Sequence, residues 1–227
     1  MRLNEGLGTL VMIGWKPRPF IFIHIPKCAG TSIEHALIPI ITGRPSFGEL
    51  SSEECRQFCL PGEEGLQHAK LADFSGRQTL EQFFKFAIVR NPWDRAVAQI
   101  MFLRRRKVDL FPIDADFRKC LRIYCESRQV IRQHDLGACQ LDFLQTSAGV
   151  LGVDFVGRFE NVAEDYKKIC VHLGLHPAPK LPHVQKSTRV WHYSAYYDDE
   201  MVQMVQQRFA QDIDCFGYRF EHQTGSK

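Results

Sequence analysis

The sequence predicts an α/β fold with a mostly parallel central sheet flanked by helices. Two apolar runs of strand length, residues 20–25 and 84–89, are each followed by a tight turn and a segment with helical spacing. Residues 152–161 are interpreted as leading to a third, short strand, which precedes another helix. Strands that alternate with helices pair in parallel, because each crossover returns the chain to the same end of the sheet. We therefore expect ligands at the carboxyl ends of these strands.

Size and charge limit the classes of protein. With 227 residues, 44% of them hydrophobic, the chain can bury a full core, so we expect one domain over residues 1–227 with its core at about 20–220. A net charge of +3 suits a small anionic ligand but is too weak for a nucleic-acid partner. The basic run at residues 104–107 is interpreted as the solvated end of a helix, where cations complement the helix dipole.

Cysteine spacing and the N-terminal residues indicate a cytoplasmic protein without a metal. The eight cysteines show no paired C-x-x-C spacing. The spacing of Cys55, Cys59 and His68 comes nearest to that of a metal site. The second pair of ligands that a structural zinc site needs is missing from it. Reduced thiols in a cytoplasmic compartment are expected. Only residues 7–13 form an apolar stretch near the start, so no signal peptide or membrane span is predicted.

Several helices can be bounded from the sequence. One should begin at about Thr31 and end before Pro39, because proline lacks a donor and clashes with the preceding turn. Residues 114–133 carry an apolar stripe at helical spacing, whereas residues 141–145 are interpreted as a loop. A further helix starts after Asn161 and is ended by a glycine at position 174.

The first strand leads into the small-residue segment Ile25-Pro26-Lys27-Cys28-Ala29-Gly30-Thr31-Ser32. Gly30 lets the backbone approach a ligand, and Thr31 and Ser32 offer hydroxyl groups and a helix N-cap. The first amides of a helix have no intrahelical partner, and with the helix dipole they attract an anion. Lys27 adds a full positive charge. The alternative interpretation is an ordinary strand–turn–helix corner with a surface lysine.

This loop differs from that of the nucleotide triphosphatases, G-x-x-x-x-G-K-[ST]. Here the lysine precedes the glycine, so the Lys-Ser/Thr pair that would hold a triphosphate and its magnesium ion is missing. A P-loop nucleotide kinase is therefore kept only as an alternative.

A second strand-to-helix corner is Arg90-Asn91-Pro92-Trp93-Asp94-Arg95-Ala96-Val97-Ala98, after the strand at 84–89. Asn91 is a favourable N-cap, and Pro92 suits the first helical position. Arg90 stands at the junction, and its planar guanidinium can form two parallel charge-assisted hydrogen bonds to a phosphate. Arg95 is interpreted as a helix residue paired with a local carboxylate, not as a phosphate contact.

Together, residues 25–32 and 90–98 resemble the 5′-phosphosulfate loop and the 3′-phosphate motif, R-[DN]-P-x-x-R-x-x-S, of the sulfotransferases that use 3′-phosphoadenosine 5′-phosphosulfate (PAPS). The similarity is to the carbohydrate sulfotransferases, which include Golgi-type and bacterial members. The phrase at residues 158–161 also resembles this family. The resemblance implies a P-loop-like three-layer sandwich with a mostly parallel central sheet flanked by helices. It also implies an enzyme that moves a sulfuryl group from PAPS to an acceptor hydroxyl without a metal.

The resemblance implies roles for individual residues. Lys27 would neutralise charge on the leaving nucleotide, 3′,5′-adenosine bisphosphate, and Arg90 would bind the 3′-phosphate. A Lys-Ser segment would lie over the nucleotide; it belongs to the connector that follows the prolines at positions 177, 179 and 182. The implied PAPS-binding residues are Lys27, Cys28, Ala29, Gly30, Thr31, Ser32, Arg90, Lys186 and Ser187.

His68 is the candidate catalytic base. In the sulfotransferases that act on sugar hydroxyls, a short histidine-containing segment at this interval after the phosphate loop supplies the base, and His68 matches it. Many members carry two histidines there, whereas Leu66 stands where the first would be. Independently, an acceptor hydroxyl needs a nearby base, and neutral imidazole titrates near physiological pH. The alternative is a surface or hydrogen-bonded structural histidine.

Two departures keep another function open. Ala98 replaces the serine that closes the 3′-phosphate motif, and Leu66 replaces a histidine. A degenerate PAPS-binding or bisphosphate-binding protein without turnover is therefore a second alternative. The expected acceptor is a carbohydrate, but a small metabolite or a peptide tyrosine stays open, because residues 43–65 carry no readable specificity code.

Overall fold

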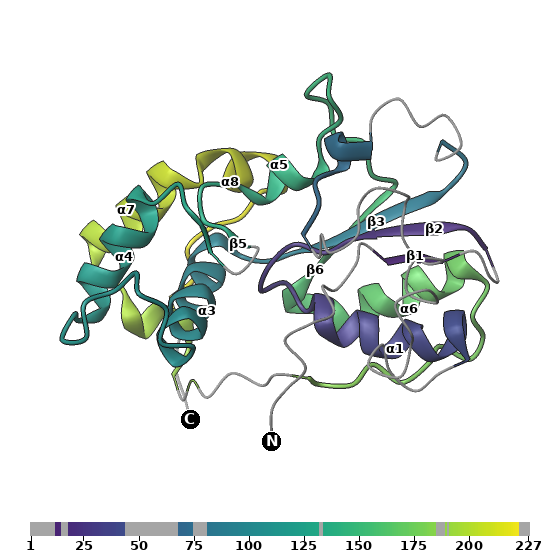
Figure 1. Cartoon of the computed structure of the whole chain (residues 1–227), viewed down its shortest axis with the longest axis horizontal. Helices are drawn as coiled ribbons and strands as arrows, with labels where there is room; N and C mark the ends of the chain where they lie inside the picture. The colour runs from purple at the N-terminus through teal and green to yellow at the C-terminus, as the bar shows by residue number, and fades with distance from the viewer. Residues whose placement is uncertain are drawn as a thin grey trace. The chain divides into compact units, whose positions relative to one another are not determined.

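The computed structural model describes residues 12–14, 18–43, 68–74, 81–131, 134–184, 189 and 191–222. The chain divides into two compact units. Unit 1 comprises the residues up to Val89 and those from Asp142 to Gln185, and unit 2 comprises residues 90–141 and those from Lys186 onward. Unit 1 contains the four-stranded sheet, and unit 2 is mainly helical with one two-stranded sheet (Figure 1). The expectation of a single domain stays a prediction.

The sheet of unit 1 has four strands in the order β1-β2-β3-β6. β2 pairs in parallel with β3, and β3 in parallel with β6, whereas β1 joins the edge in the antiparallel direction. The predicted α/β class, with a mostly parallel sheet flanked by helices, is confirmed. The strands are β1 (Met12–Gly14), β2 (Phe20–Ile23), β3 (Phe84–Val89) and β6 (Phe155–Arg158).

Burial explains the composition of these strands. All four residues of β2 are buried, as are the last four of β3, which is typical of parallel strands covered on both faces. The helices α1 (Gly30–Thr42) and α6 (Val162–Leu173) flank the sheet and lie on the same side of it in Figure 1. α6 ends at Gly174, whose left-handed backbone forms the expected C-cap. Unit 1 also contains the 3₁₀ helices η2 (Leu71–Phe74) and η4 (Phe159–Asn161).

α1 continues through Pro39, so the predicted end of this helix before proline is wrong. Proline removes one helical hydrogen bond. The helix nevertheless extends to Thr42, because its inner face is already fixed by buried residues such as Leu37 and Ile38. It stops at Gly43, a left-handed residue whose N–H donates to the Pro39 carbonyl at 3.0 Å.

Unit 2 is built from helices whose starts follow the sequence signals. The Asn91 side chain accepts a hydrogen bond from the Trp93 N–H at 3.1 Å, so the predicted N-cap is confirmed. α3 ends in exposed basic residues, as expected of a solvated helix end. The elements are α3 (Pro92–Arg105), α4 (Phe117–Glu126), β4 (Val130–Ile131), β5 (His134–Asp135), η5 (Tyr193–Tyr196), α7 (Asp199–Arg208) and α8 (Ala210–Phe216).

The helix predicted over residues 114–133 is shorter in the structure. α4 runs from Phe117 to Glu126, and its cysteines Cys120 and Cys125 are buried thiols. It ends early because the Arg128 guanidinium donates to the last carbonyls of the helix, including that of Cys125 at 3.1 Å. The backbone is extended at Ser127.

The segment 141–145, predicted as a loop, contains a short helix, α5 (Gln140–Leu144). Asp212 stabilises its start, because its two carboxylate oxygens each accept an N–H at 2.9 Å, one from Gln140 and one from Leu141. An acidic cap supplied from 72 residues away leaves no trace in the local sequence. Among the described residues, no helix is long and apolar enough to cross a membrane.

Candidate active site

The loop after β2 has the strand–turn–helix form that its sequence predicts. Residues 26–29 form a turn, and α1 begins at Gly30. The N-cap is Ala29, whose carbonyl accepts the N–H groups of Ser32 at 2.9 Å and Ile33 at 3.2 Å. The expected cap by Thr31 or Ser32 is therefore wrong, because the helix has already begun before either residue.

This helix start carries no side-chain cap. The Ser32 hydroxyl instead accepts the Val184 N–H at 3.2 Å and ties the connector of unit 1 to the first turn of α1. Lys27 and Ala29 are in the left-handed region, with φ of 67° and 64°. That conformation costs a non-glycine residue about 1–2 kcal/mol, and such strain clusters at ligand sites. The start of α1 therefore leaves its first amides without a side-chain partner, which is the feature that anion sites at helix N-termini use.

Gly30 is needed for a reason that the sequence did not reveal. A Cβ atom at this position would lie 2.0 Å from Cδ2 and 2.1 Å from Nε2 of His24. The His24 ring therefore occupies the space that any other side chain at Gly30 would fill. The absence of a side chain at Gly30 serves the packing of an imidazole against the start of α1.

His24 and Glu34 form a buried pair behind the loop. His24 directly follows β2, Glu34 lies on α1, and their side chains are 5% and 3% exposed. His24 Nδ1 lies 2.6 Å from Glu34 Oε1. Because a carboxylate oxygen accepts, His24 donates from Nδ1, which orients its ring with Nε2 toward Gly30.

His68 lies in a turn shortly before η2. Its Nδ1 donates to the main-chain carbonyl of His24 at 2.8 Å. The two rings meet edge to face, with centroids 4.7 Å apart. Since Nδ1 carries the proton in this bond, the neutral ring holds its lone pair on Nε2. In this tautomer Nε2 can accept a proton. The His24 ring packs edge to face against the His68 ring.

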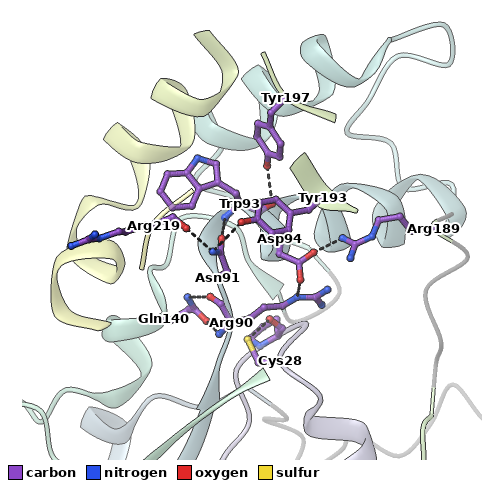
Figure 2. A network of polar contacts seen from close by, with 11 residues as sticks. Cys28, Arg90, Asn91, Trp93, Asp94, Gln140, Arg189, Tyr193, Tyr197 and Arg219 are labelled. Atoms are coloured by element: carbon purple, nitrogen blue, oxygen red, sulfur yellow. Dashed lines mark hydrogen bonds and ion pairs between the residues drawn. The ribbon is translucent and has the colours of Figure 1, made fainter. Parts of the chain in front are cut away.

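The corner in unit 2 is held through the main chain of Arg90. The Gln140 side chain accepts the Arg90 N–H and donates to the Arg90 carbonyl, both at 2.8 Å (Figure 2). Gln140 is fully buried and also donates from Nε2 to Asp212 at 3.2 Å. Burial raises the pKa of Asp212, and the charge of Arg95 and the hydrogen bonds from Gln140 and Leu141 oppose this.

The Arg90 side chain is anchored by Asp94, one helical turn later. Arg90 Nε donates to Asp94 Oδ2 at 2.8 Å, and the Arg189 guanidinium donates to the other oxygen (Figure 2). All three side chains are largely buried. One carboxylate therefore orients two guanidinium groups, which is a suitable arrangement for an anion.

Asp94 should make unit 2 sensitive to acid. Burial alone would raise the pKa of Asp94, but the charges and hydrogen bonds of Arg90 and Arg189 outweigh it and lower this pKa. A lowered pKa in the folded state stabilises the protein above the unfolded value of about 3.9, and this stabilisation is lost as the pH falls further. We expect Asp94→Asn to lower the free energy of unfolding at neutral pH, and the difference from wild type to shrink below about pH 4.

Urea denaturation between neutral and acid pH measures this difference. The exposed Asp109→Asn is the matched control and should follow the wild type throughout. A difference that stays constant with pH would exclude the charged pairing of Asp94 as its source.

Other candidate residues are placed differently or lie outside the described part of the chain. Arg95 is buried, in keeping with a structural role, and Ala98 is half-buried on α3. The predicted PAPS-binding residues Lys186 and Ser187 lie outside the described residues, as do Leu66, Cys55 and Cys59. Within the described residues, no three His, Cys, Asp or Glu side chains gather as they would around a metal ion.

Sequence reasoning missed several residues that hold these two corners. His24 could have been singled out in the sequence, because it is the single polar residue in the apolar run 20–25. The pairing of Asp94 could have been inferred from its position in the first turn of α3, four residues after Arg90. The sequence near Glu34 and Arg189 does not predict that Glu34 pairs with His24 or that Arg189 pairs with Asp94. Each pair forms only when separate segments pack together.

Comparison with known proteins shows a similarity to sulfotransferases. No curated protein matches the chain. Among solved structures, a sulfotransferase from Alicyclobacillus acidocaldarius is similar over 88% of this chain and 96% of its own, with 17% identity and a TM-score of 0.43, a likeness too loose to carry an argument. Residues 16–101, which contain both strand-to-helix corners, match the sequence model of the sulfotransferase family. This match covers less than half of the chain, and it shows that residues 16–101 are similar to the sulfotransferase family.

Proposed function

We propose that the protein transfers a sulfuryl group from PAPS to the hydroxyl group of a carbohydrate, with His68 as the base. The observation that carries this proposal is the hydrogen bond from His68 Nδ1 to the His24 carbonyl, 2.8 Å long, in the same unit as the phosphate loop. It sets the tautomer in which Nε2 can accept a proton from the acceptor. The family match supplies the class of reaction.

In this proposal the phosphate loop binds the 5′-phosphosulfate. In it, the amides of Gly30 and Thr31 and the Thr31 hydroxyl group bind the anion without competition from a side-chain cap, whereas the Ser32 N–H already donates to the Ala29 carbonyl. Lys27 adds its charge next to these amides. Cys28 and Ala29 contribute main-chain groups, since the Cys28 side chain is buried.

Arg90 would bind the 3′-phosphate. Its main chain is fixed by Gln140 and its Nε by Asp94, so little side-chain freedom is lost when the guanidinium binds a ligand. Arg189 shares the same carboxylate and would add a second positive charge. In this proposal, the fixed position of Arg90 and the charge of Arg189 compensate for the hydrogen bond that is lost because Ala98 replaces a serine.

The proposed chemical step is an in-line displacement at sulfur. The acceptor oxygen forms a bond to sulfur as His68 Nε2 takes its proton, and the bond between sulfur and the bridging oxygen breaks. The electron pair of that bond stays on the 5′-phosphate of the adenosine bisphosphate, where Lys27 neutralises the developing charge. Positioning and charge stabilisation supply most of the catalysis in transfers of this kind, by analogy with phosphoryl transfer.

A first experiment separates the classes of ligand. Thermal denaturation should show stabilisation by 3′,5′-adenosine bisphosphate and none by ATP with magnesium, because a ligand stabilises the fold that binds it. The reverse result would favour a nucleotide kinase. Transfer from radiolabelled PAPS to a panel of carbohydrates, small phenols and tyrosine peptides then distinguishes an enzyme from a binding protein that has lost turnover.

Lys27→Ala and Arg90→Lys should each weaken binding of the bisphosphate. A hydrogen bond to a charged group contributes about 1.5–3 kcal/mol, so we expect a loss of roughly 10- to 150-fold in affinity, measured by calorimetry. Arg90→Lys keeps the charge but loses the fork that binds two oxygens. The exposed replacements Lys167→Ala and Arg122→Lys are the matched controls and should bind as the wild type does. Unchanged affinity in Lys27→Ala or Arg90→Lys would remove that residue from the nucleotide site.

A further inference from the structure

Glu34 is a charged side chain that unit 1 buries almost completely, next to the apolar residue Ile33 on α1. Burying a carboxylate costs several kcal/mol unless it is paired and hydrogen-bonded. His24 provides the pairing through the 2.6 Å contact between Nδ1 and Oε1. Buried pairs of this kind add little net stability, since apolar side chains of the same volume often do as well. The pair therefore points to a role other than stability.

His24 contacts both parts of the site in unit 1. Its ring fills the space beside Gly30, the first residue of α1. The same ring meets the His68 ring edge to face, and its main-chain carbonyl accepts the His68 Nδ1–H. A rotation of this ring would therefore disturb the start of α1 and the orientation of His68 together.

Phe22 stacks on the His24 ring, with centroids 5.8 Å apart and planes inclined by 22°. The ring is thus enclosed by Phe22, Gly30 and His68, and Glu34 holds its Nδ1 edge. Of these contacts, the hydrogen bond to Glu34 is the directional one, because ring packing alone permits a flip that exchanges the nitrogen and carbon positions. Glu34 fixes which edge of His24 faces the loop.

We propose that Glu34 and His24 are a positioning pair that couples the phosphate loop to the base His68. Glu34 orients the His24 ring, and His24 in turn holds the His68 ring and the first turn of α1. Neither residue touches the substrate. This inference rests on the proposed sulfuryl transfer, which it deepens by assigning residues that act through His68.

The test compares two replacements of Glu34. Glu34→Met keeps the volume but cannot accept the hydrogen bond, whereas Glu34→Gln keeps an acceptor oxygen. We expect Glu34→Met to lower turnover about 10- to 100-fold per folded protein, the usual cost of losing a residue that orients a histidine or of a small misplacement at the reacting centre. Affinity for 3′,5′-adenosine bisphosphate should change by roughly threefold or less. Glu34→Gln should restore most of the turnover.

A second readout follows His68 directly. Proton–nitrogen NMR spectra of the imidazole rings should show His68 as a single Nδ1–H tautomer in the wild type and in Glu34→Gln, and as a mixture in Glu34→Met. His68→Gln identifies the signals. The control Glu164→Met removes an exposed glutamate on α6 and should change neither turnover nor the tautomer. If Glu34→Met does not fold, His24→Gln takes its place, because it lacks the ring but keeps the carbonyl that binds His68.

Wild-type turnover in Glu34→Met, or in His24→Gln where that variant replaces it, would overturn the positioning role, as would a single His68 tautomer in Glu34→Met. The proposed function fails in a different way: the wild type would then transfer no sulfuryl group to any acceptor, whether or not it binds the bisphosphate. The NMR comparison still decides in that case whether the pair orients His68, because it requires no substrate.

Discussion

Replacing His68 with alanine is expected to lower turnover by about 10²–10⁴-fold, the usual contribution of a general base. The acceptor oxygen would have to attack sulfur with its proton still attached. Affinity for 3′,5′-adenosine bisphosphate should change little, because the proposed contacts of His68 are to the acceptor. Single-turnover transfer from radiolabelled PAPS measures the first effect, and calorimetry measures the second.

The exposed His35, on the same unit, supplies the matched control. His35→Ala should match the wild type in both measurements. If His68→Ala keeps full turnover, His68 is not the base. If it loses turnover and nucleotide affinity together, the residue supports the loop instead of the acceptor.

Gly30→Ala should destabilise unit 1 and disable the loop, although alanine normally stabilises a helix by up to about 1 kcal/mol relative to glycine. The added Cβ would lie 2.0 Å from His24 Cδ2, far inside the contact distance of two carbons. The His24 ring cannot withdraw easily, because it is buried and bonded to Glu34. Overpacking of this kind costs about 1–3 kcal/mol, and any movement of the ring also displaces His68. Urea denaturation and the transfer assay measure the two effects.

A double-mutant cycle with His24→Ala identifies the source of that destabilisation. Removing the ring creates space for the alanine at position 30, so the double variant should lose less stability than the sum of the two single variants. Residues in contact usually couple by about 0.5–3 kcal/mol. Strictly additive losses would mean that Gly30 is required for some reason other than the His24 ring.

Local signals in the sequence were enough to identify both corners. β2 and β3 are apolar runs that a parallel sheet buries, and Asn91 with Pro92 marks the start of α3. For the same reason, the sequence predicted that the residues from Lys27 to Ser32 form a loop and that Arg90 stands at the junction of a strand and a helix. Each of these features depends on neighbouring residues, whose preferences act over one or two turns of the chain.

Long-range packing decided the features that the sequence did not reveal. α1 passes through Pro39 because burial of its inner face outweighs the hydrogen bond that proline removes. α5 exists because Asp212 caps it from 72 residues away. Neither outcome follows from local preference, since the energies that decide it come from contacts made only after folding.

The sequence by itself determined the α/β class and the positions of the two strand-to-helix corners, and it selected Lys27, Arg90 and His68 as the candidates of the proposed site. Only the tertiary structure showed that Glu34 is paired with His24, that the His24 carbonyl fixes the His68 tautomer across 44 residues, and that Asp94 orients two arginines. The physical reason is that a buried charge must find its partner wherever packing brings one, and a sequence read segment by segment does not contain that pairing.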